Sequence, residues 1–252
     1  LTELGGKAGA VAIGGGGRYL VVHFPEKGML NVFDFSEGQF LGGIATDKGD
    51  VKLAAGLTRL VVSPGGGVFR VYSLPNLERR YEGSIDLVGG VSELAMGNRT
   101  DGPLLVSNLA GDVALIELTG SGLQEVKEAR RRFDFTPTNL RALPDGTAFI
   151  SSVLSTTPPY THNVKILTET SRDWHVTSLG GAVCFAGADG NFYGNLAGAM
   201  DRKGQSLTFN SSMMAMPGRT WFLPAITRQT DLPFTQQGYM LRVIAQTLSV
   251  PV

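Results

Sequence analysis

An internal repeat of about forty residues is the feature that most constrains how this chain can fold. Each repeat contains four short apolar stretches, and each stretch has the length and composition of a β-strand. The matching stretches of the first two repeats lie 39 to 41 residues apart: 11–13 with 51–53, 18–23 with 58–63, 30–35 with 69–74, and 40–44 with 81–85. The sequence therefore predicts a unit of four strands that recurs along the chain.

Further units continue this pattern, and they start near Val91, Thr138 and Ala182. Residues 123–132 have some helical periodicity, but they stand where a fourth strand is due, so we expect a strand there. Glycine-containing turns that need a positive φ separate the apolar stretches, at Gly111-Asp112, Asp145-Gly146 and Asp189-Gly190. Beyond about residue 203 strands continue, but their places in the unit are not assigned. No segment predicts a helix.

A four-stranded unit of this length is typical of the blade of a β-propeller. One such sheet cannot bury both faces alone, whereas radial stacking covers each face with a neighbouring blade. We therefore predict an all-β fold, a single β-propeller domain of four-stranded antiparallel blades over residues 1–252. We expect six or seven blades, regular over about 8–196 and irregular over about 197–252. A β-sandwich is the alternative, but it does not explain the forty-residue self-similarity.

Several stretches resemble known propeller repeats. Residues 108–118 (NLAGDVALIEL) resemble the turn and third strand of a WD40 repeat, and residues 30–35 with 38–41 resemble its third strand and exit. Residues 144–149 (PDGTAF) resemble the second-strand entry of bacterial WD40-like and quinoprotein-like propellers. The resemblance extends over about residues 8–196 and implies the architecture. The Trp-Asp and Gly-His dipeptides of WD40 repeats are missing, so we expect their hydrogen-bond network to be missing too.

The charge balance gives no electrostatic reason to expect binding to nucleic acid or to an anionic membrane. Lys and Arg number 22, as do Asp and Glu, and the run 130–132 is interpreted as a solvated strand end. The single cysteine, Cys184, excludes an intrachain disulfide and is expected to be a buried, inert thiol. No apolar stretch reaches the ~18 residues of a membrane span. We expect a soluble, monomeric domain cut from a longer chain. The sequence does not indicate the cellular compartment.

No motif for catalysis or for binding a cofactor or metal is present. The three histidines, His23, His162 and His175, share no metal-ligand spacing, and a Gly-x-Ser-x-Gly motif is absent. We therefore expect no catalytic residue, no cofactor and no metal. The alternative is a propeller enzyme or a small-molecule or sugar binder, lactonase- or quinoprotein-like, with a site in the central channel. Its candidates are expected just before the inner strands: Asp50, Ser92, Asn139 and Arg141.

The strongest candidate for a partner site is the stretch of about ten residues at 153–162. It contains two prolines, which limit its flexibility, and it exposes an aromatic side chain. The basic run at 130–132 precedes the next inner strand and is expected on the same face. We therefore predict a protein-interaction scaffold with a partner site that includes Tyr160, His162 and Arg131. The alternative is a surface loop that binds no partner.

Overall fold

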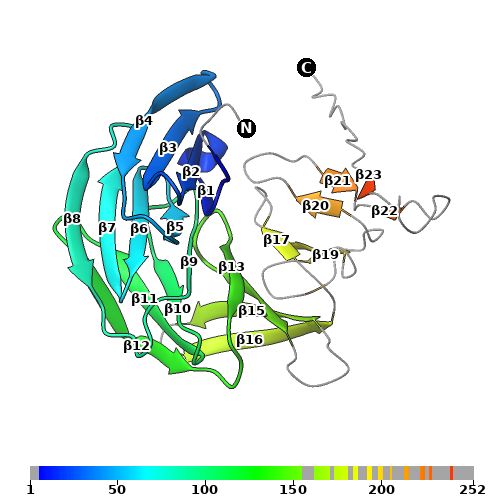
Figure 1. The fold of residues 1–252 in the computed structure, drawn as a ribbon. Helices are drawn as coiled ribbons and strands as arrows, with labels where there is room; N and C mark the ends of the chain where they lie inside the picture. Colours follow the sequence, from blue (N-terminus) through cyan, green and yellow to red (C-terminus); the bar gives the residue numbers. More distant parts are fainter. Residues whose placement is uncertain are drawn as a thin grey trace, which may run out of the picture.

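The computed structural model describes residues 6–154, 162–170 and 173–180 as a nearly continuous segment (Figure 1). Beyond it, the described residues are 184–186, 192–194, 198–200, 205, 213–215, 222–224, 227–228 and 239–240. Strands dominate these residues, and the only helical element among them is the 3-10 turn Gly15–Gly17. The predicted all-β class is confirmed.

Sixteen strands form four sheets of four strands each. Blade 1 contains β1 (Val11–Gly14), β2 (Tyr19–Phe24), β3 (Met29–Asp34) and β4 (Gln39–Ala45). Blade 2 contains β5 (Lys52–Ala55), β6 (Arg59–Gly65), β7 (Val68–Ser73) and β8 (Arg79–Ser84). Blade 3 contains β9 (Glu93–Met96), β10 (Leu104–Ser107), β11 (Asp112–Leu118) and β12 (Leu123–Arg132). Blade 4 contains β13 (Thr138–Ala142), β14 (Phe149–Leu154), β15 (His162–Thr170) and β16 (Asp173–Gly180).

Three smaller sheets follow in the C-terminal part. The strands β17 (Cys184–Ala186), β18 (Phe192–Gly194) and β19 (Gly198–Met200) form a three-stranded sheet. The pairs β20 (Met213–Ala215) with β21 (Phe222–Pro224), and β22 (Thr227–Arg228) with β23 (Tyr239–Met240), complete the described strands. Four blades are thus complete among the described residues, and the total of six or seven stays a prediction.

Every blade is an antiparallel meander, in which each strand pairs with the next one along the chain. In blade 1, Val21 of β2 pairs with Ala12 of β1 and with Val32 of β3. The ambiguous stretch Leu123–Arg132 is β12, and it pairs with β11 as predicted. Its apolar pattern departs from strict alternation because β12 contains an irregularity opposite Val113 to Leu115, which shifts the face on which the following side chains lie.

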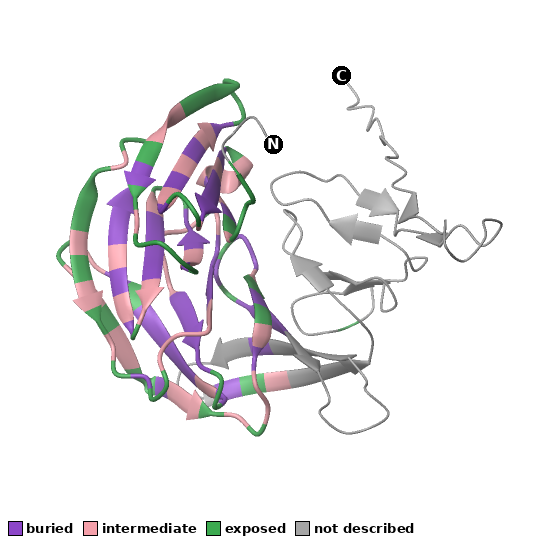
Figure 2. Cartoon of the chain, viewed as in Figure 1, coloured by how far each residue is buried: buried purple, intermediate pink, exposed green. Residues whose placement is uncertain are grey.

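The blades stack face to face around the inner strands. β1 lies next to β5, β5 next to β9, and β9 next to β13 (Figure 1). Each interface between blades has its own apolar core, drawn from two neighbouring blades, for example Val32 with Leu60, and Phe69 with Leu104. Among the described strand residues, most of the exposed ones lie in the outer strands β4, β8 and β12 (Figure 2). Radial stacking therefore buries the four-stranded sheets, as the repeat predicts.

The connections define two faces of the molecule. The connection face carries the links between blades, at 46–51, 85–92 and 133–137, and the turns that follow second strands, at 25–28 and 108–111. The hairpin face carries the loops between first and second strands, at 56–58, 97–103 and 143–148, together with the Gly15–Gly17 turn. Positive φ values of 86° at Gly111 and 73° at Gly146 confirm two of the predicted turns. Gly190 lies outside the described residues.

Candidate functional site

The hairpin face is closed near the axis by a layer of backbone hydrogen bonds between blades. The amide of Gly15 donates to the Gly56 carbonyl at 2.8 Å, and that of Gly16 donates to the Asn98 carbonyl at 2.7 Å. Leu57 donates to Thr100 at 2.9 Å, and Arg99 donates to Pro144 at 2.9 Å. The loops of blades 1 to 4 are therefore joined directly, and blade 1 reaches blade 3.

The approach between these loops is close enough to require glycine. A Cβ atom at Gly56 would lie 2.4 Å from the Thr100 carbonyl oxygen, and one at Gly97 would lie 2.5 Å from the Gly146 nitrogen. Backbone packs directly against backbone at these points.

The predicted channel candidates do not come together as a site. Asp50 is exposed in the link between blades 1 and 2. The Ser92 hydroxyl donates to the Ser107 carbonyl at 3.1 Å, and an Arg141 nitrogen donates to the neighbouring Leu140 carbonyl at 2.8 Å. Asn139 lies within β13 with a positive φ of 50°. Among the described residues, no three His, Cys, Asp or Glu side chains gather closely enough to hold a metal ion.

Asn108 organises the connection face around blade 3. Its side chain is fully buried in the turn between β10 and β11. The amide nitrogen donates to the Val88 carbonyl at 2.7 Å and to the Asp112 carboxylate at 2.8 Å. The amide oxygen accepts from the backbone nitrogens of Ala110 and Asp112, at 2.9 and 2.8 Å. One side chain therefore fixes its own turn and joins it to the 85–92 connection.

Two large apolar side chains project from the loops that Asn108 joins. Val88 is 75% exposed and Leu109 is 74% exposed, the highest values among the large hydrophobic residues that the structure describes. The Leu109 carbonyl accepts from the Thr136 hydroxyl at 3.0 Å, which ties the turn to the 133–137 connection as well. The pair, Val88 and Leu109, is named here the apolar pair. Sequence reasoning missed it, although both residues are large apolar residues in glycine-containing segments between strands.

The predicted partner residues are placed as follows. Arg131 lies in β12, opposite Val113 of β11, and β11 follows the 108–111 turn that contains Leu109. The Arg131 side chain donates to the Arg130 carbonyl at 2.9 Å. The neighbouring Arg130 donates to the Asp86 carbonyl in the 85–92 connection and forms an ion pair with Glu125 at 3.3 Å. The basic run thus borders the connection face.

The predicted loop at 153–162 is shorter than expected, and this is a correction. Antiparallel pairing continues to its ends, with Val153 opposite Asn163 and Leu154 opposite His162. His162 therefore belongs to β15 and does not lie in a loop, because ladder hydrogen bonds extend further than the apolar pattern indicated. Tyr160 lies outside the described residues. Residues 155–161, which link β14 to β15 along the chain, lie outside the described residues.

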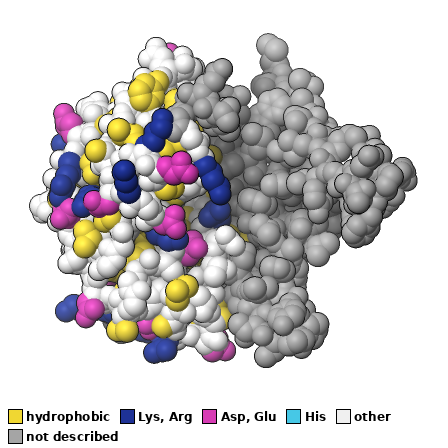
Figure 3. Space-filling model, viewed as in Figure 1, with side chains coloured by type: hydrophobic (Ala, Val, Ile, Leu, Met, Phe, Trp, Pro, Cys, Tyr) yellow, Lys and Arg dark blue, Asp and Glu magenta, His cyan; other side chains and the backbone are white. Residues whose placement is uncertain are grey.

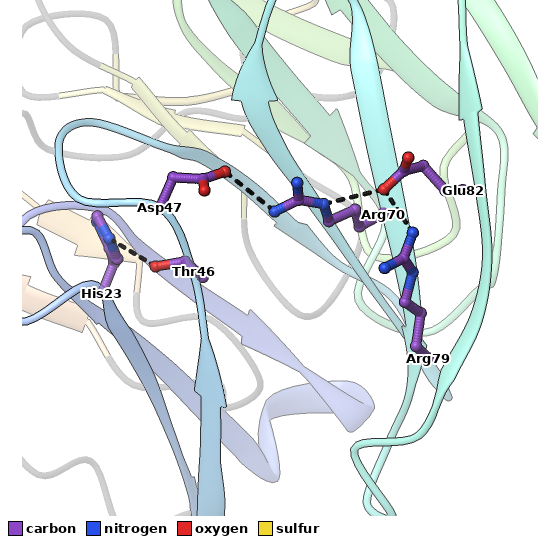
Figure 4. Close-up of polar contacts among 6 residues, drawn as sticks. All are labelled: His23, Thr46, Asp47, Arg70, Arg79 and Glu82. Carbon is purple, nitrogen blue, oxygen red and sulfur yellow. Dashed lines mark hydrogen bonds and ion pairs between the residues drawn. The ribbon is translucent and has the colours of Figure 1, made fainter.

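A charged network lies where blades 1 and 2 meet on the same face (Figure 4). Arg70 of β7 forms ion pairs with Asp47, in the link between the blades, at 3.1 Å and with Glu82 of β8 at 3.0 Å. Arg79 binds the same Glu82 at 2.5 Å. Exposed pairs of this kind contribute little stability. Charges of both signs are interspersed over the described part of the visible surface (Figure 3).

Buried polar residues mark the ends of the second strands. His23 is the last but one residue of β2, and Ser63 and Ser107 hold the matching positions near the ends of β6 and β10, as the repeat predicts. All three are fully buried. His23 Nε2 lies 3.4 Å from the Thr46 hydroxyl (Figure 4), whereas His23 Nδ1 and both serine hydroxyls lack a hydrogen-bond partner in the described structure. Burial lowers the pKa of His23, and Asp50 only partly offsets this.

His23→Ser is expected to flatten the pH dependence of stability as the pH falls below about 7. Because the folded-state pKa of His23 lies below the unfolded value of about 6.5, the unfolded chain binds more protons. The histidine's share of stability is therefore full above that pH and declines as the pH falls toward the folded-state pKa. Urea unfolding at pH 7.5, 6.5 and 5.5 measures this for both proteins. Equal slopes in the two proteins would contradict the burial effect, since His162 and His175 are common to both.

Comparison with known proteins finds likeness in structure only. No model of a known protein family matches the chain, and no curated protein matches its sequence. The β-propeller domain of Myceliophteria thermophila Cps50 (Swd1) covers 93% of this chain and 70% of its own, at 10% identity and a TM-score of 0.54. The match to a functionally unknown protein from Desulfotomaculum acetoxidans covers 84% of this chain and 73% of that protein, at 13% identity and a TM-score of 0.58. The match to Kuenenia stuttgartiensis hydrazine synthase covers 84% of this chain and 72% of that protein, at 11% identity and a TM-score of 0.54.

At these identities the likeness shows the fold alone. Together with the four complete blades, it defines the class: this protein is a β-propeller. No helix of the described part is long and apolar enough to cross a membrane. A propeller fold by itself does not define an activity, so function has to be argued from the two faces.

Proposed function

We propose that this protein is a WD40-like propeller that acts as a non-catalytic, protein-interaction scaffold and binds its partner through the connection face around blade 3. The observation that carries the proposal is the apolar pair, Val88 and Leu109, which is held exposed by the fully buried Asn108. The resemblance of residues 108–118 to a WD40 turn and third strand supports the same reading. As a domain, the propeller is expected to be monomeric.

The physical argument rests on rigidity. Exposed apolar side chains on mobile loops lose conformational entropy when they bind, which weakens the complex. Here the four hydrogen bonds of the Asn108 side chain fix the 108–111 turn, and one of them joins it to the 85–92 connection. The apolar pair is therefore presented in one arrangement before any partner arrives. Neighbouring apolar residues with a polar and basic border are the pattern of an interface core and its rim.

The hairpin face lacks these properties near the axis, because the loops there are joined to one another by backbone hydrogen bonds. A channel site would need polar side chains from several blades to converge. In the described part Ser92 and Arg141 donate to nearby backbone carbonyls instead. The scaffold function is therefore favoured over the channel enzyme.

The test identifies a partner by its contact point and then measures affinity. A photo-crosslinking amino acid at position 109 should capture a partner in cells, whereas the same amino acid at position 35 should not. Phe35 is a matched control, since it is 62% exposed in the turn between β3 and β4, on the opposite face. With the captured partner purified, Val88→Ser with Leu109→Ser should weaken binding by tenfold to a hundredfold. Phe35→Ser should leave the affinity within about twofold.

A second pair of substitutions tests the predicted partner residues Tyr160 and Arg131. Tyr160→Ala with Arg131→Ala is expected to weaken binding of the same partner, since Tyr and Arg are favoured contact residues. Unchanged affinity in this variant would show that Tyr160 and Arg131 do not belong to the partner site. Unchanged affinity in the Val88 and Leu109 variant would show that the partner does not bind through the apolar pair. Both results together would leave the scaffold proposal without support.

A further inference from the structure

A small pocket opens on the hairpin face, away from the apolar pair. Its volume is about 270 Å³, and it is lined by residues of blade 2 together with Gly120, which lies in the turn between β11 and β12 of blade 3. This is just below the size range of drug-like ligand sites and suits a small molecule. The pocket lies where a loop of blade 3 meets the outer half of blade 2, so its lining is fixed by contacts between blades.

The lining has two positive charges and no negative one. Arg59 and Arg80 both line the pocket, and no Asp or Glu does. Arg59 is oriented by its Nη1 atom, which donates to the Leu118 carbonyl at 2.5 Å and to the Thr119 carbonyl at 3.1 Å. These bonds use one guanidinium nitrogen, and the guanidinium also interacts with the Tyr81 hydroxyl, so part of its five N–H donors remains for a ligand. Arg80 is exposed, and in the described part of the chain it makes no hydrogen bond or ion pair.

A buried hydroxyl adds a further donor. The Tyr81 hydroxyl is buried, and the Arg59 guanidinium lies close enough to interact with its oxygen, whereas its own hydrogen has no acceptor among the described residues. Burial raises the pKa of Tyr81 and the Asp101 carboxylate adds to this, while the charge of Arg59 and its hydrogen bond to the hydroxyl only partly offset it, so the hydroxyl keeps its proton at neutral pH. A buried hydroxyl hydrogen without an acceptor is unfavourable, and an incoming acceptor atom removes that cost.

The other hydroxyls of the pocket direct their hydrogens elsewhere. Thr58 donates to the Asp101 carboxylate at 2.5 Å, and Ser73 donates to the Glu78 carbonyl at 3.3 Å. The donors that remain are therefore those of two guanidinium groups, of the Tyr81 hydroxyl and of the Asn76 amide. A lining with positive charge and surplus donors is complementary to a ligand with negative charge and several oxygen acceptors.

We propose that this pocket is a binding site for a small oxyanion, a carboxylate or a phosphate, held between Arg59, Arg80 and the Tyr81 hydroxyl. Guanidinium groups bind both kinds of oxyanion through paired N–H donors. The site is independent of the proposed scaffold function, because it lies on the opposite face. The Arg59 bonds to the Leu118 and Thr119 carbonyls already join blade 2 to blade 3 at this pocket.

The experiment titrates the whole chain with glutarate and, separately, with inorganic phosphate, each at an ionic strength held constant with chloride. Binding is followed by the NMR signals of the arginine Nε–H groups. Saturable shifts with a Kd on the order of 1 mM are expected for at least one of the two anions. The ratio of the two affinities identifies whether a carboxylate or a phosphate is the better ligand.

Matched variants separate a site from general charge. Arg80→Gln should weaken binding by about tenfold or more, and Tyr81→Phe should weaken it severalfold with the charge unchanged. Arg79→Gln is the control, since it removes the same charge one residue away but its guanidinium binds Glu82 at 2.5 Å and does not line the pocket. The affinity of the Arg79→Gln variant for the anion should stay within about twofold of that of the parent protein.

Two results would overturn the proposal. One is the absence of saturable binding of either anion up to about 20 mM, well above the expected Kd. The other is an equal loss of affinity in Arg79→Gln and Arg80→Gln, which would indicate diffuse attraction to a basic surface. Either result concerns the pocket alone, and the partner measurements on Val88 and Leu109 are not affected by it.

Discussion

Gly97→Ala is expected to lower the free energy of unfolding by about 3 kcal/mol or more. The added Cβ atom would lie 2.5 Å from the Gly146 nitrogen, 2.6 Å from the Pro144 oxygen and 2.7 Å from the Leu143 oxygen. All three are backbone atoms, so no side chain can rotate away to relieve the contact. The loops of blades 3 and 4 would have to separate, which would also disturb the bond between Arg99 and Pro144.

Urea unfolding followed by far-UV circular dichroism measures this loss, and Gly122→Ala is the matched control. Nothing lies within 4 Å of a Cβ atom at Gly122, and its φ is not positive. The control should therefore stay within about 0.5 kcal/mol of the parent protein. If Gly97→Ala were equally neutral, the loops would not be in the close contact described, and the argument for closure of the hairpin face would fail.

Trp174→Ala is expected to cost about 3 to 5 kcal/mol of stability. Trp174 of β16 is only 8% exposed and packs edge-on against Phe133 and Phe149, with ring centroids 6.4 Å apart in each case. Its indole nitrogen donates to the Ala129 carbonyl of β12 at 2.6 Å. One side chain thus joins the outer strands of blades 3 and 4, and its removal leaves both a cavity and an unpaired carbonyl.

Two further variants divide this effect. Trp174→Phe keeps an aromatic ring but removes the bond to Ala129, so a smaller loss of about 1 to 3 kcal/mol is expected. His175→Ala changes the exposed neighbour and should be nearly neutral. The same urea titrations provide these values. A Trp174→Phe variant as unstable as Trp174→Ala would mean that the hydrogen bond, and not the packing of the ring, dominates.

Much of the fold followed from local pattern. The apolar stretches of the repeat predicted the strands of blades 1 and 2, and the position of residues 123–132 within the repeat identified β12 where periodicity alone suggested a helix. Glycine positions predicted turns at Gly111 and Gly146. These features depend on residues close together in the chain, and they are repeated, so each unit supports the interpretation of the next.

The candidate sites were not predictable in the same way. The apolar pair was missed because the turn at Gly111 was predictable, but the exposure of Leu109 within it depends on how the turn packs against the 85–92 and 133–137 connections. His162 was placed in a loop because the extent of strand pairing depends on Leu154 opposite it. The pocket was missed because Arg59, Tyr81 and Gly120 come from separate blade elements and meet only in three dimensions.

The sequence by itself determined the secondary structure, the four-stranded unit and its recurrence, since these depend on alternation and on turn residues within about forty positions. Only the tertiary structure decided how the units meet. Gly16 reaches Asn98, Arg59 reaches Leu118, and Trp174 reaches Ala129, each across a boundary between blades. Such contacts depend on the angle and distance between stacked sheets, which the periodicity within one sheet does not specify.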